Sequence, residues 1–423
     1  MEGSTWYGNI PTDWSVDRFK RIATIRNGQV DPEDDRYKDL PLFAPNHIES
    51  GTGRLLEVES ADAQGAESGK FLVEPGEVIY SKIRPELRKV IVAPFKGLCS
   101  ADMYPVRPLY RVEARFLYYE MLSDGFSQYT LLESGRVAMP KINRQSLGEC
   151  IFVYPDLKQQ ARICEYLDLS CAAIDAAMAA KRRQIETLDE LRKATLHAAF
   201  ANENWPVERV KDVAIKIGSG VTPEGGASGY LDEGIPLLRS QNVHFDGLRL
   251  EDVAFISQET HAEMASSQLK PQDVLLNITG ASIGRCTFVP DDFGEGNVNQ
   301  HVCIIRVSHK LHHRFFAAFL ASPRGQEQVL SSFTGASRQG LSHKELGFIS
   351  IPLPALKIQR DTLGKIEQQD SKQNQVRKSI ESQITTLNAY RKSLIHECVT
   401  GQRRVTEADL VRVRRTETES TRA

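Results

Sequence analysis

Loops rich in Arg, Lys, Asn, Gln and Ser recur at corresponding places in the two halves of this chain. In the first half, the candidate residues are Lys82, Arg84, Arg88, Lys89, Arg136, Lys141, Asn143 and Arg144. In the second half, they are Arg239, Gln241, Asn242, Arg338, Gln339, His343 and Lys344. Such side chains bind phosphate oxygens and the edges of DNA bases. Solvated surface loops have a similar composition, so it is the recurrence in both halves that predicts a DNA-binding role.

Motifs for catalysis or metal binding are missing from the sequence. The stretch GASIGRC at Gly280 lacks the spacing and the Lys of a phosphate-binding loop. The sequence contains no HExxH motif, nucleophile elbow, amino-methylating motif or S-adenosylmethionine loop. His301, His312 and His313 are more typical of surface or core histidines than of metal ligands. We therefore predict no catalytic site, no metal site and no cofactor in this chain.

The composition is that of an ordinary globular protein, with 41% hydrophobic residues and a net charge of −2. Contact with nucleic acid must then come from local patches, because the chain as a whole is not basic. Its seven cysteines form no CxxC pair, which predicts reduced, mostly buried thiols. No apolar run is long enough for a membrane span, and the polar N-terminus does not resemble a signal peptide. We expect a cytoplasmic protein without membrane contact.

Two long helical stretches must position the loops. Residues 155–202 contain no Gly and only an initial Pro, and mostly apolar residues recur every seven positions, as in a coiled coil. Residues 354–401 repeat this stretch 199 positions later without a gap. The two predicted seams are Leu167, Ile174, Lys181, Leu188 and Thr195, and Ile366, Gln373, Ile380, Leu387 and Leu394. Two helices in one register predict a paired rod.

The segments before the helices also repeat. Pro75 in FLVEPGEVIYSKI corresponds to Pro271 in SQLKPQDVLLNIT, and SLGECIFVYP corresponds to ELGFISIPLP. Short β-branched runs such as VIYSKI and HVCIIRV predict strands, and RVEARFLYYEMLSD predicts a helix. The predicted fold is α/β, with two globular domains joined by two long antiparallel coiled-coil helices in an internal pseudo-twofold duplication.

The repeat predicts five segments. These are a first domain (1–154), a central spacer helix (155–202), a second domain (203–353), a C-terminal spacer helix (354–401) and a charged, mobile tail (402–423). The tail shows no core-forming pattern. Several apolar helix residues fall off the seam, and we expect a partner protein to cover them. They are Met178, Ile185, Phe200, Ile384, Ile395 and Val399.

The doubled arrangement resembles the specificity subunit of type I restriction–modification enzymes. The residues that carry the resemblance are Pro155–Gln160 with Leu188–Lys193, and Leu353–Gln359 with Tyr390–Leu394. It covers residues 10–401 in the order of that family, although each short motif is weak alone. The first copy departs from the usual Pro-Leu-Pro turn, since it has Val153, Tyr154 and Pro155.

The resemblance implies a non-catalytic subunit with two target-recognition domains. Each would read one half of a bipartite, asymmetric site in double-stranded DNA, with the paired helices as spacer. It also implies two modification (methyltransferase) subunits docked on the helices and restriction (translocase and nuclease) subunits joined to them. S-adenosylmethionine, ATP and Mg would then belong to those subunits, which methylate adenine and cut DNA.

Two alternatives remain open from the sequence. One is the specificity subunit of a fused restriction–methylation enzyme, in which a single partner carries both activities. The other is an adapter that binds no DNA and uses the coiled coil to scaffold proteins. If the helices act as a ruler, inserting a helical turn at Ala201–Asn204 is expected to widen the gap between the half-sites.

Overall fold

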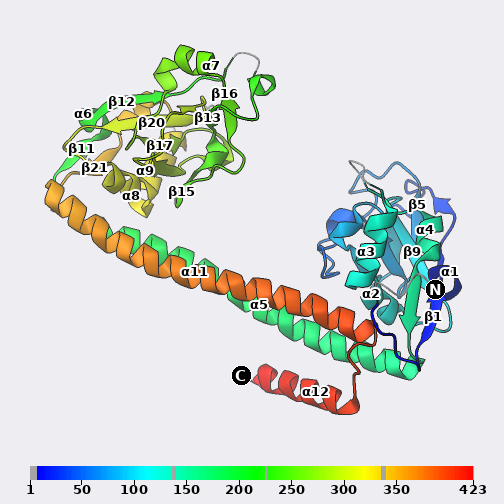
Figure 1. Cartoon of the computed structure of the whole chain (residues 1–423). Helices are drawn as coiled ribbons and strands as arrows, with labels where there is room; N and C mark the ends of the chain where they lie inside the picture. The colour runs from blue at the N-terminus through cyan, green and yellow to red at the C-terminus, as the bar shows by residue number, and fades with distance from the viewer. Residues whose placement is uncertain (1–6, 136–139, 224–225, 335–339, 423) are drawn as a thin grey trace. The chain divides into compact units, whose positions relative to one another are not determined.

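The computed structural model describes residues 7–135, 140–223, 226–334 and 340–422. The chain folds into two compact units, residues 1–182 with 381–423 and residues 183–380 (Figure 1). Each unit therefore contains one globular domain and parts of both long helices. We describe each unit separately.

The first unit holds two four-stranded sheets. One sheet has the order β2-β9-β6-β7 and the other the order β3-β5-β8-β4. The strands of the first are β2 (Ala23–Ile25), β9 (Met103–Pro108), β6 (Val78–Ser81) and β7 (Val90–Val92), all antiparallel. Those of the second are β3 (Gln29–Val30), β5 (Lys70–Val73), β8 (Gly97–Cys99) and β4 (Leu42–Phe43), with β4 and β8 parallel. β1 (Ser15–Arg18) pairs with β10 (Ile151–Tyr154), which places the two ends of the domain together.

The second unit repeats the main sheet and differs in the smaller one. Its main sheet has the order β12-β20-β17-β18, and a smaller sheet has the order β16-β13-β19. The strands are β12 (Ala214–Ser219), β20 (Val302–Val307), β17 (Val274–Asn277), β18 (Cys286–Phe288), β16 (Ala254–Ile256), β13 (Ile235–Leu238) and β19 (Asn297–Val298). β13 and β19 are parallel, as β4 and β8 are in the first unit. β14 (Val243–His244) and β15 (Gly247–Leu248) form a hairpin, and β11 (Val207–Arg209) pairs with β21 (Ser350–Pro352).

Short helices accompany the main sheets in the same order in both units. They are α1 (Phe19–Ile22), α2 (Ala114–Leu122), α3 (Asp124–Glu133) and α4 (Arg144–Glu149) in the first. In the second they are α6 (Val210–Val213), α8 (His313–Ala321), α9 (Pro323–Thr334) and α10 (His343–Gly347), with an additional α7 (Gln258–Glu263). The α/β class and the internal duplication predicted from the sequence are confirmed.

The two long helices are α5 (Leu157–Ala199, 43 residues) and α11 (Leu356–Val399, 44 residues). Both ends of each helix lie within three residues of the predicted ones. Pro155 precedes the start of α5 and Pro354 precedes the start of α11. In the second unit, Asp189 pairs with Arg377 and Arg192 pairs with Asp370, so α5 and α11 run antiparallel there. None of the ten predicted seam residues is exposed.

One buried Gln fixes the start of each long helix to its domain. The Gln160 side chain accepts from the Glu113 amide at 2.9 Å and donates to the carbonyls of Arg111 and Pro155, both at 2.9 Å. Gln359 makes the same three bonds, accepting from the amide of His312 at 2.8 Å and donating to the carbonyls of Lys310 and Pro354 at 3.0 and 2.7 Å. The Gln of the repeated motif thus sets the angle at which each helix leaves its domain.

The prediction for the apolar residues outside the seam is wrong for four of the six. Met178, Phe200, Ile395 and Val399 are at most 5% exposed and belong to the cores of the two units. Phe200, for example, packs edge-on against Phe315 and Phe319. The periodicity of the helix could not show that its last turn is covered by a domain from the same chain. Ile185 and Ile384 are partly buried.

The tail also needs a correction. Residues Glu407–Arg422 form α12, and the buried Val405 and Leu410 join the core of the first unit. Arg414 pairs with Glu165 of α5, beside which α12 lies (Figure 1). The apolar residues are too few and too widely spaced to predict a core by themselves, but they suffice to dock one helix on an existing core.

Candidate nucleic-acid interface

A buried carboxylate paired with Arg anchors the turn before one central strand of each main sheet, β6 in the first unit and β17 in the second. Glu77 is 4% exposed, and its Oε1 lies 2.6 Å from Arg26 and 3.0 Å from Arg107. In the second unit, Asp273 is fully buried and receives two 2.7 Å hydrogen bonds from Arg306. Charge-assisted bonds of this kind hold the strand firmly, so the loop that follows it is presented on a rigid base.

Four of the predicted residues lie in the loop after β6, and two of them are held by side-chain bonds within the domain. Arg88 is held within the domain, because it donates to Ser127 Oγ at 3.0 Å and pairs with Asp124 at 2.6 Å. Lys89 likewise donates to a backbone carbonyl, that of Pro45, at 2.6 Å. Both groups are therefore already engaged in fixing the loop.

Of the other two residues, one lies at the surface and one is partly buried. Arg84 is exposed and has a φ of 46°, a strained conformation for a non-glycine residue. Lys82 is partly exposed, with its Nζ 5.5 Å from the centre of the Tyr104 ring.

The structure brings the start of α4 to this same loop. Ile83 and the exposed Lys141 form an isolated β-bridge, and the Asn143 side chain caps α4 by accepting from the Ser146 amide at 2.7 Å. Arg144 of α4 stacks on the ring of Tyr104, with 5.3 Å between the guanidinium carbon and the ring centre.

The Arg144 guanidinium also bonds to Asn27 Oδ1 at 2.6 Å. We call the joint cluster the first basic surface; it consists of Lys82, Arg84, Lys141, Asn143 and Arg144. The Tyr104 hydroxyl donates to the Ile142 carbonyl at 3.3 Å, and burial raises its pKa.

In the second unit, the loop after β13 is held by its own polar side chains. The buried Asn242 accepts from the Arg239 amide at 2.9 Å and donates to the Arg249 carbonyl at 2.8 Å. Arg239 itself donates to the Asp252 carbonyl at 2.7 Å. Asn242 and Arg239 thus build the loop, whereas Gln241 is exposed.

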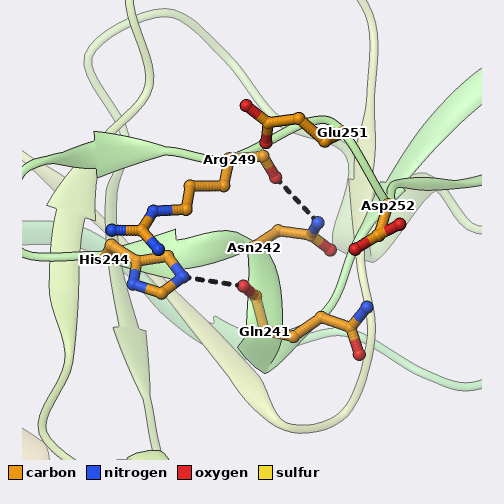
Figure 2. A pocket seen from close by; sticks show the side chains of 6 residues that line it. All are labelled: Gln241, Asn242, His244, Arg249, Glu251 and Asp252. Atoms are coloured by element: carbon orange, nitrogen blue, oxygen red, sulfur yellow. Dashed lines mark hydrogen bonds between the residues drawn. The ribbon is translucent and has the colours of Figure 1, made fainter. Parts of the chain in front are cut away.

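These residues surround a polar pocket of about 470 Å³ (Figure 2). It is lined by Gln241, Asn242, His244, Arg249, Glu251 and Asp252. His244 Nε2 lies 2.9 Å from the carbonyl oxygen of Gln241, which orients the imidazole ring (Figure 2). Cationic donors and carboxylate acceptors together match the mixed edges of bases better than they match phosphate, which the carboxylates repel.

The start of α10 matches that of α4 in the first unit. The Leu341 amide donates to the Ile278 carbonyl at 3.0 Å, as the Ile142 amide does to the Lys82 carbonyl at 3.0 Å. His343 accepts from the Ser219 amide at 3.0 Å, and Lys344 is exposed.

Three predicted residues, Arg136, Arg338 and Gln339, lie outside the described residues. Sequence reasoning missed His244, Arg249, Glu251 and Asp252. Their contribution depends on the β14–β15 hairpin folding back, and no motif marks that turn.

Within the described ranges, no cluster of metal-ligating side chains is found. Across the same residues, no helix has the length and apolar character to cross a membrane. All seven cysteines are free and buried, as predicted.

Comparison with known proteins gives a consistent family. Residues 11–187 and 202–386 both match a family model described as the type I restriction modification DNA specificity domain. The type I restriction enzyme EcoDI specificity subunit of Escherichia coli is 34% identical over 203 residues, which cover 47% of this chain and 45% of that protein. The EcoBI specificity subunit of the same species is 23% identical, over 68% of this chain and 65% of that protein. The chain thus matches less than two thirds of the length of these two relatives.

A longer match is the putative MjaX specificity subunit of Methanocaldococcus jannaschii, which is 22% identical over 95% of this chain and 96% of that protein. A chain solved in a study of complex assembly and conformational transition of the type I R-M system superposes with a TM-score of 0.70. The match covers 92% of this chain and 98% of that one at 18% identity, so the likeness concerns the fold.

Proposed function

This chain belongs to the type I restriction–modification DNA specificity family, and we propose that its two domains each read one half of a bipartite, asymmetric DNA site. The duplication is the observation that carries this proposal. The order of the main sheet, a buried carboxylate paired with Arg and a buried Gln recur in both units, while the loops differ. Two similar scaffolds with different loops suit two different half-sites.

We propose that the two units contact DNA with chemically different surfaces. The first basic surface offers the side chains of Lys82, Arg84 and Lys141, which suit phosphates and guanine edges. Arg144, held by Asn27 and the Arg26 carbonyl, and Asn143, which caps α4, support this surface. The pocket of the second unit adds Glu251 and Asp252, which suit the amino group of cytosine. Divergence between the two surfaces supports an asymmetric target.

The long helices are proposed to space the two half-sites and to dock the partners. A helix of 43 residues is about 65 Å long at 1.5 Å per residue. Because most of the off-seam residues predicted for docking are buried, we place docking at apolar residues that the helices expose. Leu191 of α5 and Val376 of α11 are 51% and 49% exposed, and both belong to the second unit.

In this proposal the chain supplies specificity and the partners supply catalysis. Modification subunits bring S-adenosylmethionine and methylate adenine, and restriction subunits bring ATP and Mg to translocate and cut DNA. The complex would act in the cytoplasm.

Mapping of methylated adenines in host DNA tests this function. With the gene present, we expect methylation at one bipartite motif whose two halves differ and are separated by a fixed gap. Deleting the gene, while keeping its neighbours, is expected to abolish methylation at that motif alone. A methylome that is the same in both strains would contradict a DNA-specificity role and favour the adapter.

A further inference from the structure

Two arginines at matched positions, Arg192 and Arg391, each join both long helices to a loop of one domain. In the first unit, Arg391 of α11 has a side chain only 4% exposed. Its Nε lies 3.1 Å from Asp175 Oδ1 of α5. Its Nη atoms donate to the carbonyls of Gly51 at 3.0 Å and Thr52 at 3.2 Å.

The second unit repeats this junction with the helices exchanged. Arg192 of α5 lies 3.4 Å from both carboxylate oxygens of Asp370 on α11. Its Nη2 also donates to the Phe245 carbonyl at 3.2 Å. The guanidinium is suited to this task, because its donors form a rigid fork that reaches several acceptors at once.

The carbonyls that receive these bonds lie at the tips of corresponding turns. Gly51 and Thr52 lie between Ile48 and Leu55, which form a β-bridge, and the Gly51 amide donates to the Leu87 carbonyl of the loop after β6 at 3.1 Å. Phe245 lies between β14 and β15. The base of the second turn lines the polar pocket through Asn242, His244 and Arg249 (Figure 2).

The two turns are held to different degrees. In the first unit, the Tyr118 hydroxyl also donates to the Thr52 carbonyl at 2.8 Å, so the domain itself holds the tip. In the second unit, residue 317 is Ala at the position that corresponds to Tyr118, so this hydroxyl is missing there. The tip of the second turn therefore lacks the second hydrogen bond that Thr52 receives in the first.

We infer that Arg192 and Arg391 are positioning residues that hold each domain's recognition turn against the helix pair, and so set base discrimination in one half-site each. This inference rests on the proposed function. The physical reason is that a hairpin of two short strands is marginally stable by itself, so fixing its tip to a long helix adds to the hold that the buried Asn242 and Val243 already give its base. The ordered base then presents His244 and Arg249 in one geometry.

The test uses the full chain assembled with its modification partner. Methylation rates are measured on the correct DNA and on DNAs with single base changes in either half-site. Arg192→Ala is expected to lower discrimination in one half-site by about tenfold, equivalent to about 1.4 kcal/mol. Discrimination in the other half-site is expected to stay unchanged. Arg391→Ala should show a smaller loss, in the opposite half-site.

Lys193→Ala is the matched control, because Lys193 is the next residue on α5, is exposed and pairs with Glu190 of the same helix at 2.7 Å. It should leave both half-sites unchanged. If an alanine variant unfolds, the methionine variant at the same residue, Arg192→Met or Arg391→Met, is tested in its place, because it keeps the aliphatic packing.

Equal loss of rate on every DNA, or equal relaxation of both half-sites, would overturn the inference. Absence of site-specific methylation by the wild-type complex would instead overturn the proposed function, so the two failures are distinguishable.

Discussion

At the scale of single residues, the core of the first unit contains a carboxyl group whose burial has a consequence for stability. Glu120 of α2 is fully buried, next to the Tyr7 hydroxyl, which itself donates to the Ile151 carbonyl at 2.5 Å. Burial raises the pKa of the Glu120 carboxyl well above its usual range. The folded chain therefore keeps a proton that the unfolded chain releases above about pH 4.5.

The pH dependence of unfolding tests this protonation. Stability should fall as pH rises from about 4.5 toward the raised pKa, with a slope of up to about 1.4 kcal/mol per pH unit from this group. Glu120→Gln removes the titration, so the variant should lose less stability than wild type between about pH 5 and pH 8. Denaturant unfolding at both pH values measures this, and identical slopes for the two proteins would contradict it.

A second residue prediction concerns the turn before the central strand. Gly76 has a φ of 85°, and at the corresponding place Gln272 has a φ of 71°. A side chain in this region costs about 1–2 kcal/mol, and glycine costs about 0.5–1 kcal/mol in entropy. Gln272→Gly should then stabilise the second unit by about 0.5–1 kcal/mol, less the contribution of its 3.0 Å bond to Asp291. Thermal unfolding measures the gain, and Gly76→Gln, which should destabilise, is the reverse control.

At the scale of elements, each long helix is tied to its own domain at its first turns. The buried Gln acts at the start, and an ion pair follows, Arg115 with Asp168 at 2.5 Å and Arg314 with Glu367 at 2.9 Å. The last turn of each helix packs into the core of the other unit, through Phe200 in one case. Among the apolar residues that the helices expose, Leu191 and Val376 are those that the proposal assigns to partner proteins.

Association with the modification partner tests that surface. Leu191→Ser combined with Val376→Ser should weaken association by about tenfold, because two half-exposed apolar side chains no longer add buried area. The thermal midpoint should change little, since neither residue is in a core. Ile215→Ser, at a residue that is 70% exposed on β12, is the control and should leave association unchanged. Equal association of the double variant and wild type would remove these residues from the docking surface.

At the scale of the whole molecule, the structure changes the position at which an insertion would lengthen the long helices. Phe200 is buried among Phe315 and Phe319 of the second domain. An insertion at Ala201–Asn204 therefore adds slack after the helix has already docked, and the gap should stay constant. If the helices set the spacing as proposed, a change in the gap requires an insertion in both helices, after Arg182 and after Ile380, where the two units meet in the sequence.

About four residues inserted at both places extend the rod by about 6 Å and rotate it by about 40°. One base pair advances DNA by about 3.4 Å and rotates it by about 34–36°. The added rotation of the helices equals that of about one base pair, and the added length equals that of one to two base pairs. The gap between the half-sites should therefore grow by one to two base pairs, with both half-sites unchanged. Methylome mapping of this variant, beside a variant with the same insertion after Asn202, provides the comparison. An unchanged gap in the double insertion would mean that the helices do not set the spacing.

The sequence by itself determined the duplication, the two long helices and the α/β class. These features follow from local periodicity and from repeats such as Pro155 and Gln160 with Pro354 and Gln359, which need no knowledge of distant contacts. It also selected loops that the structure brings together, since Lys82 and Arg144 meet at one tyrosine ring.

Only the tertiary structure decided which apolar and polar residues are free. Val399 looks uncovered on a helical wheel, but it is fully buried, because a domain from the same chain packs on that turn. Arg88 resembles its neighbour Arg84 in the sequence, but an ion pair with Asp124 engages it. Burial and hydrogen-bond partners come from residues far along the chain, and a single sequence carries no record of which distant segments meet.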